Sequence, residues 1–335
     1  MKQLVCCAEY RDAERFEEDA GWPGLTAADW ERTQPDAHWR LIGDNDATLA
    51  RLSLWWSRVA QHAGARLGYV GHYAAGDREA GEHLLHHGLA ELERHGATLA
   101  VGPIDGNTWE RYRFITEAGV EPPFFLDLQH PLDWPQHFAA CGFTPFSEYR
   151  STLCEDLATL PGAVATLDAR FAARGGIRVR PLDMTRLEQD LSAVYRLSLV
   201  SFRDHLFYTP VSETAFLKQY SALLRFVDPR LVLLAEHETG LAGFVFCVPD
   251  HLQRARGVVP DTLVIKTLAV LPGARYAGLG VVLTKRAQIR AHELGYRRAI
   301  HAMMHDAGQC GRMNQRRHGT RVIRRYALYA REIAR

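Results

Sequence analysis

One short motif restricts the fold of this chain more than any other feature. The residues Arg275-Tyr276-Ala277-Gly278-Leu279-Gly280 lie directly between an apolar segment, Thr262 to Val270, and an amphipathic segment that begins at Leu279. The first segment predicts a strand. The second predicts a helix with one buried face, because its apolar positions recur at helical spacing, at Leu283, Ala287, Ala291 and Leu294. The motif therefore lies at a strand-to-helix turn.

Glycines in such a turn let the backbone approach a ligand closely, and the N–H groups of the first helical turn favour an anion. Arg275 adds a permanent positive charge that can bind phosphate oxygens. The residues therefore predict a pyrophosphate site. Two alternatives stay open: the glycines can simply permit tight packing, and a dinucleotide site uses a similar turn. We discount the dinucleotide alternative because the third glycine is absent and the strand is the fourth of its half.

The second half of the chain predicts a regular order of elements around this turn. The order is strand, helix, helix, three strands, helix, strand, helix, strand. The ranges are 177–182, 185–203, 213–226, 231–235, 241–248, 262–270, 279–294, 298–304, 308–318 and 321–331. This order predicts a mixed, mostly antiparallel sheet flanked by helices, which is a mixed α/β fold class.

The first half repeats this order loosely. We expect a strand at 3–8, helices at 12–19 and 26–32, a hairpin at 39–42 and 48–56, a strand at 66–72, a helix at 79–95 and a strand at 98–101. At 335 residues the chain also exceeds the usual size of one hydrophobic core. A diverged internal duplication explains both observations. We place the two domains at residues 1–156 and 177–335, joined by a small-residue linker at 157–176.

At this point a family resemblance can be stated. Arg-x-x-Gly-x-Gly after a fourth strand resembles the pyrophosphate motif of the GCN5-related N-acetyltransferase (GNAT) superfamily, and the order of elements in residues 177–335 is similar to that fold. The resemblance implies acetyl-CoA or another acyl-CoA as cosubstrate. It implies that backbone groups of Leu268 and Val270 hold the pantetheine arm, that Arg275 and the backbone of Tyr276, Ala277, Gly278, Leu279 and Gly280 hold the pyrophosphate, and that Asn314 reaches the CoA end.

The first half is less similar to this pattern. Its equivalent turn reads Ala75-Gly-Asp-Arg-Glu-Ala-Gly81, with Asp77 and Glu79 where phosphate would bind. Carboxylates repel phosphate. We therefore expect a degenerate copy that has lost CoA binding and instead shapes the interface between the domains or, together with the loop 202–212, the substrate pocket. The loop 102–112 is a candidate for lining a ligand cleft, although a packed loop anchored by Trp109 is the simpler interpretation.

Direct transfer to an amine needs a proton acceptor and often an acid for the leaving thiolate. His301 and His305 on the predicted fifth strand are the candidate bases, since histidine titrates near neutral pH. Glu236 is a weaker candidate. The resemblance implies a tyrosine acid on the helix after that strand, but residues 307–318 contain none. Tyr326 on the last strand is the candidate replacement, and its odd spacing from Tyr329 predicts that at most one of the two faces the cleft.

Other chemistries are less favoured. Cys310 lacks a recognisable cysteine–histidine signature, and direct transfer needs no thiol nucleophile. His83 and His87 share a helical face but have no partner cluster, so we expect no metal. The formal charge of +1 gives no reason to expect nucleic acid or an anionic membrane. The apolar runs are strand-length and the six cysteines form no C-x-x-C pair, so we expect a cytoplasmic protein without disulfides.

The sequence therefore predicts an acyl-CoA-dependent N-acyltransferase acting on a small-molecule or peptidic amine. Two alternatives stay open. One is a transferase that uses a longer acyl-CoA or, less favoured because of the intact pyrophosphate motif, aminoacyl-tRNA. The other is a non-catalytic acyl-CoA sensor, which the absent helix tyrosine and the degenerate first half suggest.

Overall fold

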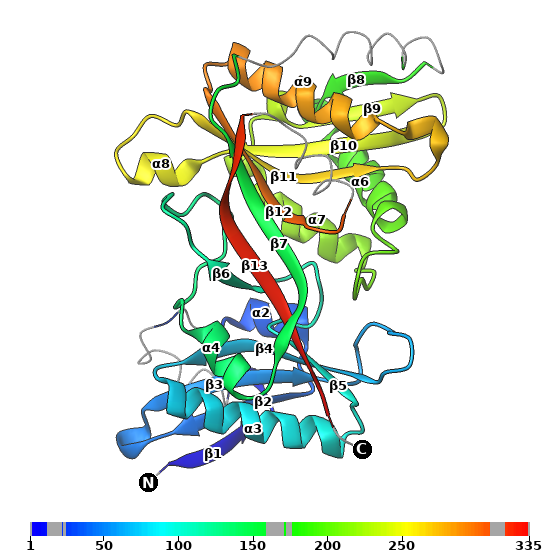
Figure 1. Ribbon diagram of the computed structural model, residues 1–335. Helices are drawn as coiled ribbons and strands as arrows, with labels where there is room; N and C mark the ends of the chain where they lie inside the picture. Colours follow the sequence, from blue (N-terminus) through cyan, green and yellow to red (C-terminus); the bar gives the residue numbers. More distant parts are fainter. Residues whose placement is uncertain are drawn as a thin grey trace.

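The computed structural model describes residues 2–11, 22, 25–158, 171, 176–308 and 319–333 (Figure 1). The first half contains β1 (Gln3–Cys7), α2 (Ala27–Thr33), β2 (Ala37–Ile42), β3 (Thr48–Trp55), β4 (Leu67–Ala75), α3 (Arg78–Arg94), β5 (Leu99–Gly102), β6 (Phe114–Glu117), α4 (Trp134–Ala140) and β7 (Thr144–Cys154). The second half contains β8 (Arg178–Pro181), α6 (Leu187–Ser201), α7 (Glu213–Leu223), β9 (Leu233–His237), β10 (Gly240–Pro249), α8 (His251–Ala255), β11 (Thr262–Val270), α9 (Leu279–Glu293), β12 (Arg298–His305) and β13 (Thr320–Glu332).

These strands form one mixed sheet that runs through both halves. Its order is β1-β2-β3-β4-β5-β13-β7-β12-β11-β10-β9-β8, and β6 pairs with β13 beside this path. The pairs β4/β5 and β11/β12 are parallel, and the other pairs are antiparallel. The predicted fold class, a mixed and mostly antiparallel sheet flanked by helices, is confirmed.

The two halves exchange their last strands. β7 of the first half pairs with β12 of the second, and β13 of the second half pairs with β5 of the first. β7 and β13 also pair with each other, and Figure 1 shows them side by side along the middle of the molecule. The sequence did not indicate this exchange. The limits at residues 156 and 177 stay a prediction, but a sheet confined to residues 177–335 would lack its central strand β7.

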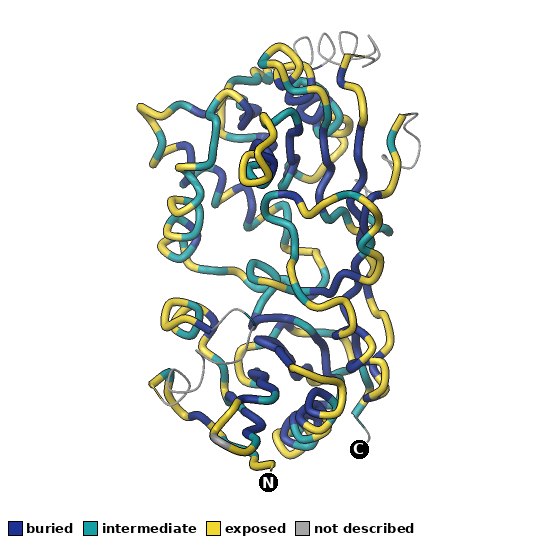
Figure 2. The backbone as a smooth tube through the Cα atoms, turned by 90° about the vertical axis from the view of Figure 1, so that its left-hand side faces the viewer, coloured by how far each residue is buried: buried dark blue, intermediate teal, exposed yellow. Residues whose placement is uncertain are grey.

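Helices cover the sheet in layers. In the second half, α9 packs on the face that carries Val245 and Leu263, while α6 and α7 pack on the opposite face, which carries Phe244 and Val264. Neighbouring residues of a strand point to opposite faces, so these strands are buried on both sides. In the first half, α3 covers the face of Leu52. Figure 2 shows the resulting pattern, with buried strands inside and exposed loops and helix faces outside.

The duplication predicted from the sequence is visible in the topology. The succession β3-β4-α3-β5 corresponds to β10-β11-α9-β12, each with one parallel pair and one helical crossover. Both halves also carry a β-bulge, in β4 and in β11.

In β4, His72 and Tyr73 lie opposite the single residue Leu52 of β3. In β11, Lys266 is the extra residue, because its neighbours Ile265 and Thr267 pair with adjacent residues of β10. Bulges often lie next to functional sites.

Most elements predicted in the second half are confirmed. The strand 262–270 has the expected bounds, and α9 begins at Leu279 as expected. In the first half, α2, α3 and β2 to β5 are confirmed within a few residues, whereas β6, α4, β7 and, in the second half, α8 were not predicted. The predicted helices at 12–19 and 308–318 lie almost wholly outside the described residues.

Candidate functional site

The turn that carries the motif leaves the start of α9 without a side-chain cap. Its N-cap residue Gly278 has φ +94°, a left-handed conformation that favours glycine, and a Cβ added there would meet no heavy atom within 4 Å. Among the described residues, the N–H groups of Leu279 and Gly280 have no hydrogen-bond acceptor. Open space, free N–H groups and the positive end of the helix dipole together fit a bound anion.

The residues before the cap form a short 3-10 helix, Ala274–Tyr276. Arg275 is exposed, with its guanidinium carbon 5.7 Å from the centre of the Tyr276 ring. The Tyr276 ring in turn stacks on His237 of β9, and the Tyr276 hydroxyl lies 3.2 Å from His237 Nε2. The aromatic stack holds this turn on the sheet and leaves Arg275 exposed beside it.

Next to this turn, the parallel strands β11 and β12 separate. Their pairing runs from Thr262↔Arg298 to Ile265↔His301 and ends there, although β11 continues to Val270 and β12 to His305. Such a gap between neighbouring strands leaves the backbone of β11 free on one edge. The Leu271 N–H donates to Ala242 O of β10 at 2.8 Å. By alternation, the backbone groups of Leu268 and Val270 point away from β10, toward the gap. The Val270 carbonyl also accepts a hydrogen bond of 3.1 Å from Ser201 Oγ.

The equivalent positions of the first half are filled by the chain itself. The N-cap residue of α3 is Asp77, whose carboxylate accepts from the Ala80 N–H at 2.8 Å. Where β4 and β5 separate, the Ile104 N–H donates to Val70 O at 2.9 Å and the His72 N–H donates to Asp105 Oδ1 at 2.6 Å. The helix start and the strand edge are thus both satisfied internally in this half.

The two candidate histidine bases lie in different surroundings. His301 is buried, and its Nε2 lies 3.1 Å from Gln288 Nε2 of α9. His305 is exposed at the end of β12, with its ring 5.1 Å from Tyr149. Burial, opposed by the neighbouring Asp306, lowers the pKa of His305. His305 is therefore neutral near pH 7 and the more accessible of the two. Glu236 instead forms an ion pair with Arg180 at 2.6 Å, which lowers the pKa of its carboxyl group.

The candidate acid Tyr326 is 1% exposed. Its hydroxyl donates to Asp127 Oδ1 at 2.9 Å and lies 3.0 Å from Ser151 Oγ, and burial together with the Asp127 charge raises its pKa. Tyr329 is also buried, in the core on the other face. The odd spacing predicted the opposite orientations, but both side chains are enclosed because β13 is an interior strand between β5, β6 and β7.

Two sequence candidates, Asn314 and Cys310, lie outside the described residues. In the parts of the chain that the structure describes, no group of three or more histidine, cysteine, aspartate and glutamate side chains could hold a metal ion. Nor does any described helix have the length and apolarity needed to cross a membrane.

Sequence reasoning missed Lys266, the extra residue of the β11 bulge. Its Nζ donates to Leu126 O at 3.2 Å and lies 3.5 Å from Met303 Sδ. Leu126 belongs to the first half of the chain, so that half contributes directly to the region where β11 and β12 separate. The signal was present: a lysine inside the otherwise apolar strand 262–270 is a charge at a position where burial is expected.

The loops 102–112 and 202–212 contact each other. Trp109 Nε1 donates to Thr209 O at 2.9 Å, and its ring packs against Phe202 and Phe216. Phe207, from the loop 202–212, is 3% exposed and stacks on Phe146 of β7. These contacts favour the interpretation of 102–112 as a packed loop anchored by Trp109. They also fasten the second half's loop to the first half.

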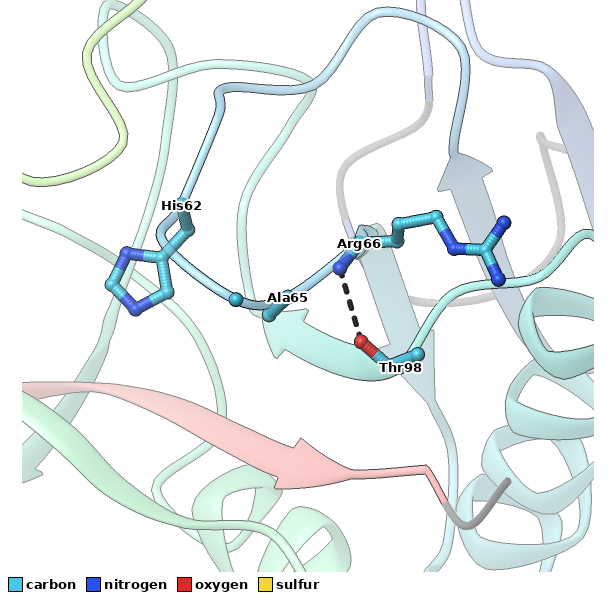
Figure 3. Close-up of a pocket in the computed structure, with 5 residues that line it drawn as sticks. His62, Ala65, Arg66 and Thr98 are labelled. Carbon is cyan, nitrogen blue, oxygen red and sulfur yellow. Dashed lines mark hydrogen bonds between the residues drawn. The ribbon is translucent and has the colours of Figure 1, made fainter.

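A pocket of about 370 Å³ lies on the connection from β3 to β4 (Figure 3), and its lining residue His62 packs edge-on against Phe146 and Phe207. It is lined by His62, Gly64, Ala65, Arg66 and Thr98, and the Arg66 N–H donates to Thr98 Oγ1 at 3.0 Å. No predicted site residue lines it. A much smaller apolar pocket of about 20 Å³ lies between α6, α7 and β10, lined by Leu182, Leu191, Val194, Tyr220, Leu224, Val227, Val232, Phe244 and Phe246.

Comparison with known proteins gives no match to a protein-family model. A curated protein, the bacterial ceramide synthase of Caulobacter vibrioides (strain NA1000 / CB15N), is 23% identical over 184 residues, which is 55% of this chain and 48% of that protein. The match therefore spans less than half of the relative's length.

Solved structures are similar over nearly the whole chain. A GCN5-related N-acetyltransferase from Sphaerobacter thermophilus has a TM-score of 0.51 at 16% identity, covering 92% of this chain and 84% of that one. One from Anabaena variabilis ATCC 29413 has 0.55 at 9% identity, covering 100% and 73%. A tandem GNAT protein from the clavulanic acid biosynthesis pathway has 0.51 at 13% identity, covering 100% and 99%. This chain therefore has the GCN5-related N-acetyltransferase fold in tandem arrangement.

Proposed function

We propose that the chain is an acyl-CoA-dependent N-acyltransferase, with acetyl-CoA as the first donor to test and a small-molecule or peptidic primary amine as acceptor. The observation that carries the proposal is the contrast between the two helix starts. Gly278 leaves the first N–H groups of α9 free, next to an open strand edge, whereas Asp77 caps α3 with a carboxylate. The free helix start suits a pyrophosphate, and the capped one does not.

In this proposal the second half holds the donor. The free N–H groups at the start of α9 and the Arg275 side chain bind the pyrophosphate, whereas the N–H groups of Tyr276 and Ala277 already donate to Gly273 O and Ala274 O. The edge of β11 at Leu268 and Val270 binds the pantetheine arm. The thioester then lies where β11 and β12 separate. The backbone there can orient the reacting carbonyl and stabilise the negative charge that develops on its oxygen. The first half binds no CoA and contributes residues that approach the acceptor amine.

The experiment is a titration of acetyl-CoA into the full chain by calorimetry, followed by measurement of CoA thiol release with a panel of primary amines and mass analysis of the products. We expect one binding site per chain and thiol release that depends on an amine. Two sites per chain would contradict the proposal for the first half, and the absence of binding would refute the donor assignment. Binding without amine-dependent release across the panel would favour an acyl-CoA sensor.

A second candidate is transfer of a long acyl chain. It is favoured by the similarity of part of the chain to a protein named bacterial ceramide synthase and by the apolar pocket between α6, α7 and β10. At about 20 Å³ that pocket has room for little more than a methylene group, so a long chain would require α6 and α7 to move apart. Competition of octanoyl-CoA and palmitoyl-CoA with acetyl-CoA in the same titration separates the two candidates.

A further inference from the structure

Lys266 occupies a distinctive place in the sheet. On β10 the adjacent residues Phe246 and Cys247 pair with Thr267 and Ile265, so Lys266 between them has no partner across the strand pair. Ile265 is also the last residue of β11 that pairs with β12. The lysine therefore follows the point at which the two parallel strands separate, where the proposed function places the thioester. A bulge is a common device for re-aiming one side chain at such a position.

The amine of Lys266 has two neutral partners. These are the carbonyl oxygen of Leu126, at 3.2 Å, and the thioether sulfur of Met303, at 3.5 Å. A neutral lysine amine carries two N–H groups and one lone pair, whereas an ammonium carries three donors. The two partners satisfy the N–H groups of the neutral amine and leave its lone pair available.

The charges around this amine also favour its neutral form. Arg113 lies nearby, with its guanidinium stacked on the rings of Tyr112 and Tyr149 and donating to Met303 O. Asp127 is the carboxylate that faces the lysine, but it forms an ion pair with Arg324 and accepts a hydrogen bond from the Tyr326 hydroxyl. Burial, with Arg113 adding to it and Asp127 opposing it, lowers the pKa of Lys266 to about 8.

The residue type itself carries information in this chain. The sequence has 40 lysine and arginine residues, of which only Lys2, Lys218, Lys266 and Lys285 are lysines. An arginine cannot lose its proton near neutral pH, whereas a buried lysine can. The strand 262–270 thus carries a lysine, which can act as a base, where an arginine could not.

We propose that Lys266 is the general base of the acyl transfer and accepts the proton of the attacking amine. The proposal rests on the proposed function and deepens it. As the amine nitrogen forms its bond to the thioester carbon, the carbon–sulfur bond breaks and CoA leaves as a thiolate. One proton passes from the amine nitrogen to Lys266 Nζ, and the resulting ammonium returns it to the thiolate or to solvent. A base whose pKa lies near the working pH is effective in this role.

The first half offers an internal comparison. Its bulge contains His72, which lies further along β4, beyond Tyr69, the last residue of β4 that pairs with β5; that imidazole is a potential base as well. There, however, His72 Nδ1 lies 2.9 Å from Ser53 Oγ and its backbone N–H donates to Asp105. The residue is 3% exposed. Both copies thus have a basic side chain at the bulge, and only Lys266 lies beside an open strand edge.

The test compares Lys266→Arg and Lys266→Met with the control Lys218→Arg, which alters a lysine of α7 on the far side of the sheet from the turn at Gly278. Each variant is titrated with acetyl-CoA and assayed for amine-dependent thiol release from pH 6 to 10, with the amine panel described above. We expect all variants to bind acetyl-CoA, the control to keep wild-type turnover, and both Lys266 variants to lose about 10²-fold or more, since general bases contribute about 10²–10⁴. The wild-type rate should rise with pH to a plateau through an apparent pKa near 8, and this limb should be absent in Lys266→Met.

The outcomes distinguish failure of the proposed function from failure of the assignment of Lys266 as the base. Failure of wild type to bind acetyl-CoA refutes the proposed function itself. Wild-type turnover in Lys266→Arg would show that a positive charge suffices, and wild-type turnover in Lys266→Met that the side chain is dispensable; either result overturns the base assignment. Binding without amine-dependent release by wild type also overturns it. As an acceptor-independent measurement, trace labelling with acetic anhydride should give Lys266 a pKa near 8, and acetyl-CoA should protect it from labelling; an ordinary lysine pKa or no protection would contradict the proposal.

Discussion

Replacement of Gly278 by aspartate should abolish donor binding while leaving the fold intact. The new Cβ meets no heavy atom within 4 Å, so the cost to folding comes from the backbone, because φ +94° disfavours a side chain by about 1–2 kcal/mol. The carboxylate at the start of α9 offsets about 0.3–1 kcal/mol of this through the helix dipole. The net loss of stability should therefore be small.

The same carboxylate opposes a bound pyrophosphate. Two negative charges about 4 Å apart repel each other by about 4 kcal/mol at an effective dielectric constant of 20, and dissolved salt reduces this. A penalty of about 3–4 kcal/mol corresponds to binding weakened by about 10²–10³-fold. Calorimetric titration of acetyl-CoA at fixed ionic strength measures this loss directly.

Gly295 provides a matched control at the other end of the same helix. It also has φ +94°, and a Cβ added there would likewise meet no heavy atom within 4 Å, so Gly295→Asp introduces the same strain and the same charge. Its carboxylate faces the negative end of the dipole, so this variant should lose slightly more stability than Gly278→Asp in urea unfolding. It should nevertheless bind acetyl-CoA like wild type. Binding by Gly278→Asp at wild-type strength, or equal loss in both variants, would refute the assignment of the α9 start as the donor site.

Three further predictions concern stability and the exchange of strands. Burial lowers the pKa of His72 to about 4, so between about pH 6.5 and pH 4 the unfolded chain binds a proton that the folded chain does not. The free energy of unfolding should therefore fall by about 3 kcal/mol over this range as the pH drops, and His72→Gln should flatten this dependence in urea unfolding. The Glu236 carboxyl, whose pKa Arg180 lowers, contributes stability that is lost as pH falls below about 4.5, and Arg180→Met should remove that contribution. Residues 177–335 expressed alone should aggregate by light scattering, because β12 and β13 lose β7; a soluble monomer would contradict this.

The sequence predicted local elements well because each has a strong periodic pattern. The strand 262–270 and the start of α9 at Leu279 follow from an apolar run and a stripe at helical spacing. The exchange of β7 and β13 could not be predicted in this way. A strand's own pattern specifies which face is buried but not which neighbour it pairs with.

The candidate site was predictable to the same extent. The motif at 275–280 located the free helix start, because glycines and their spacing are local features. Tyr326 was selected by its place on the last strand, but its burial depends on Asp127 and Ser151, which are distant in sequence. Lys266 was overlooked because its strand was predicted from the apolar residues around it, and the lysine was not considered separately. The bulge at Lys266 can be recognised only when the pairing with β10 is known.

The asymmetry between the two copies has a common structural origin in the segment that follows β5. Ile104 and Asp105, at its start, hydrogen-bond to the edge of β4 and close the gap of the first half. Further along, the same segment supplies Arg113 and Leu126, which surround Lys266 beside the gap of the second half. The segment that closes the gap between β4 and β5 therefore continues to the gap between β11 and β12 and lines it. The exchanged strands fix this arrangement, since β13 pairs with both β5 and β7. If the start of α9 holds the donor, as we propose, the site beside it is lined by residues from both halves.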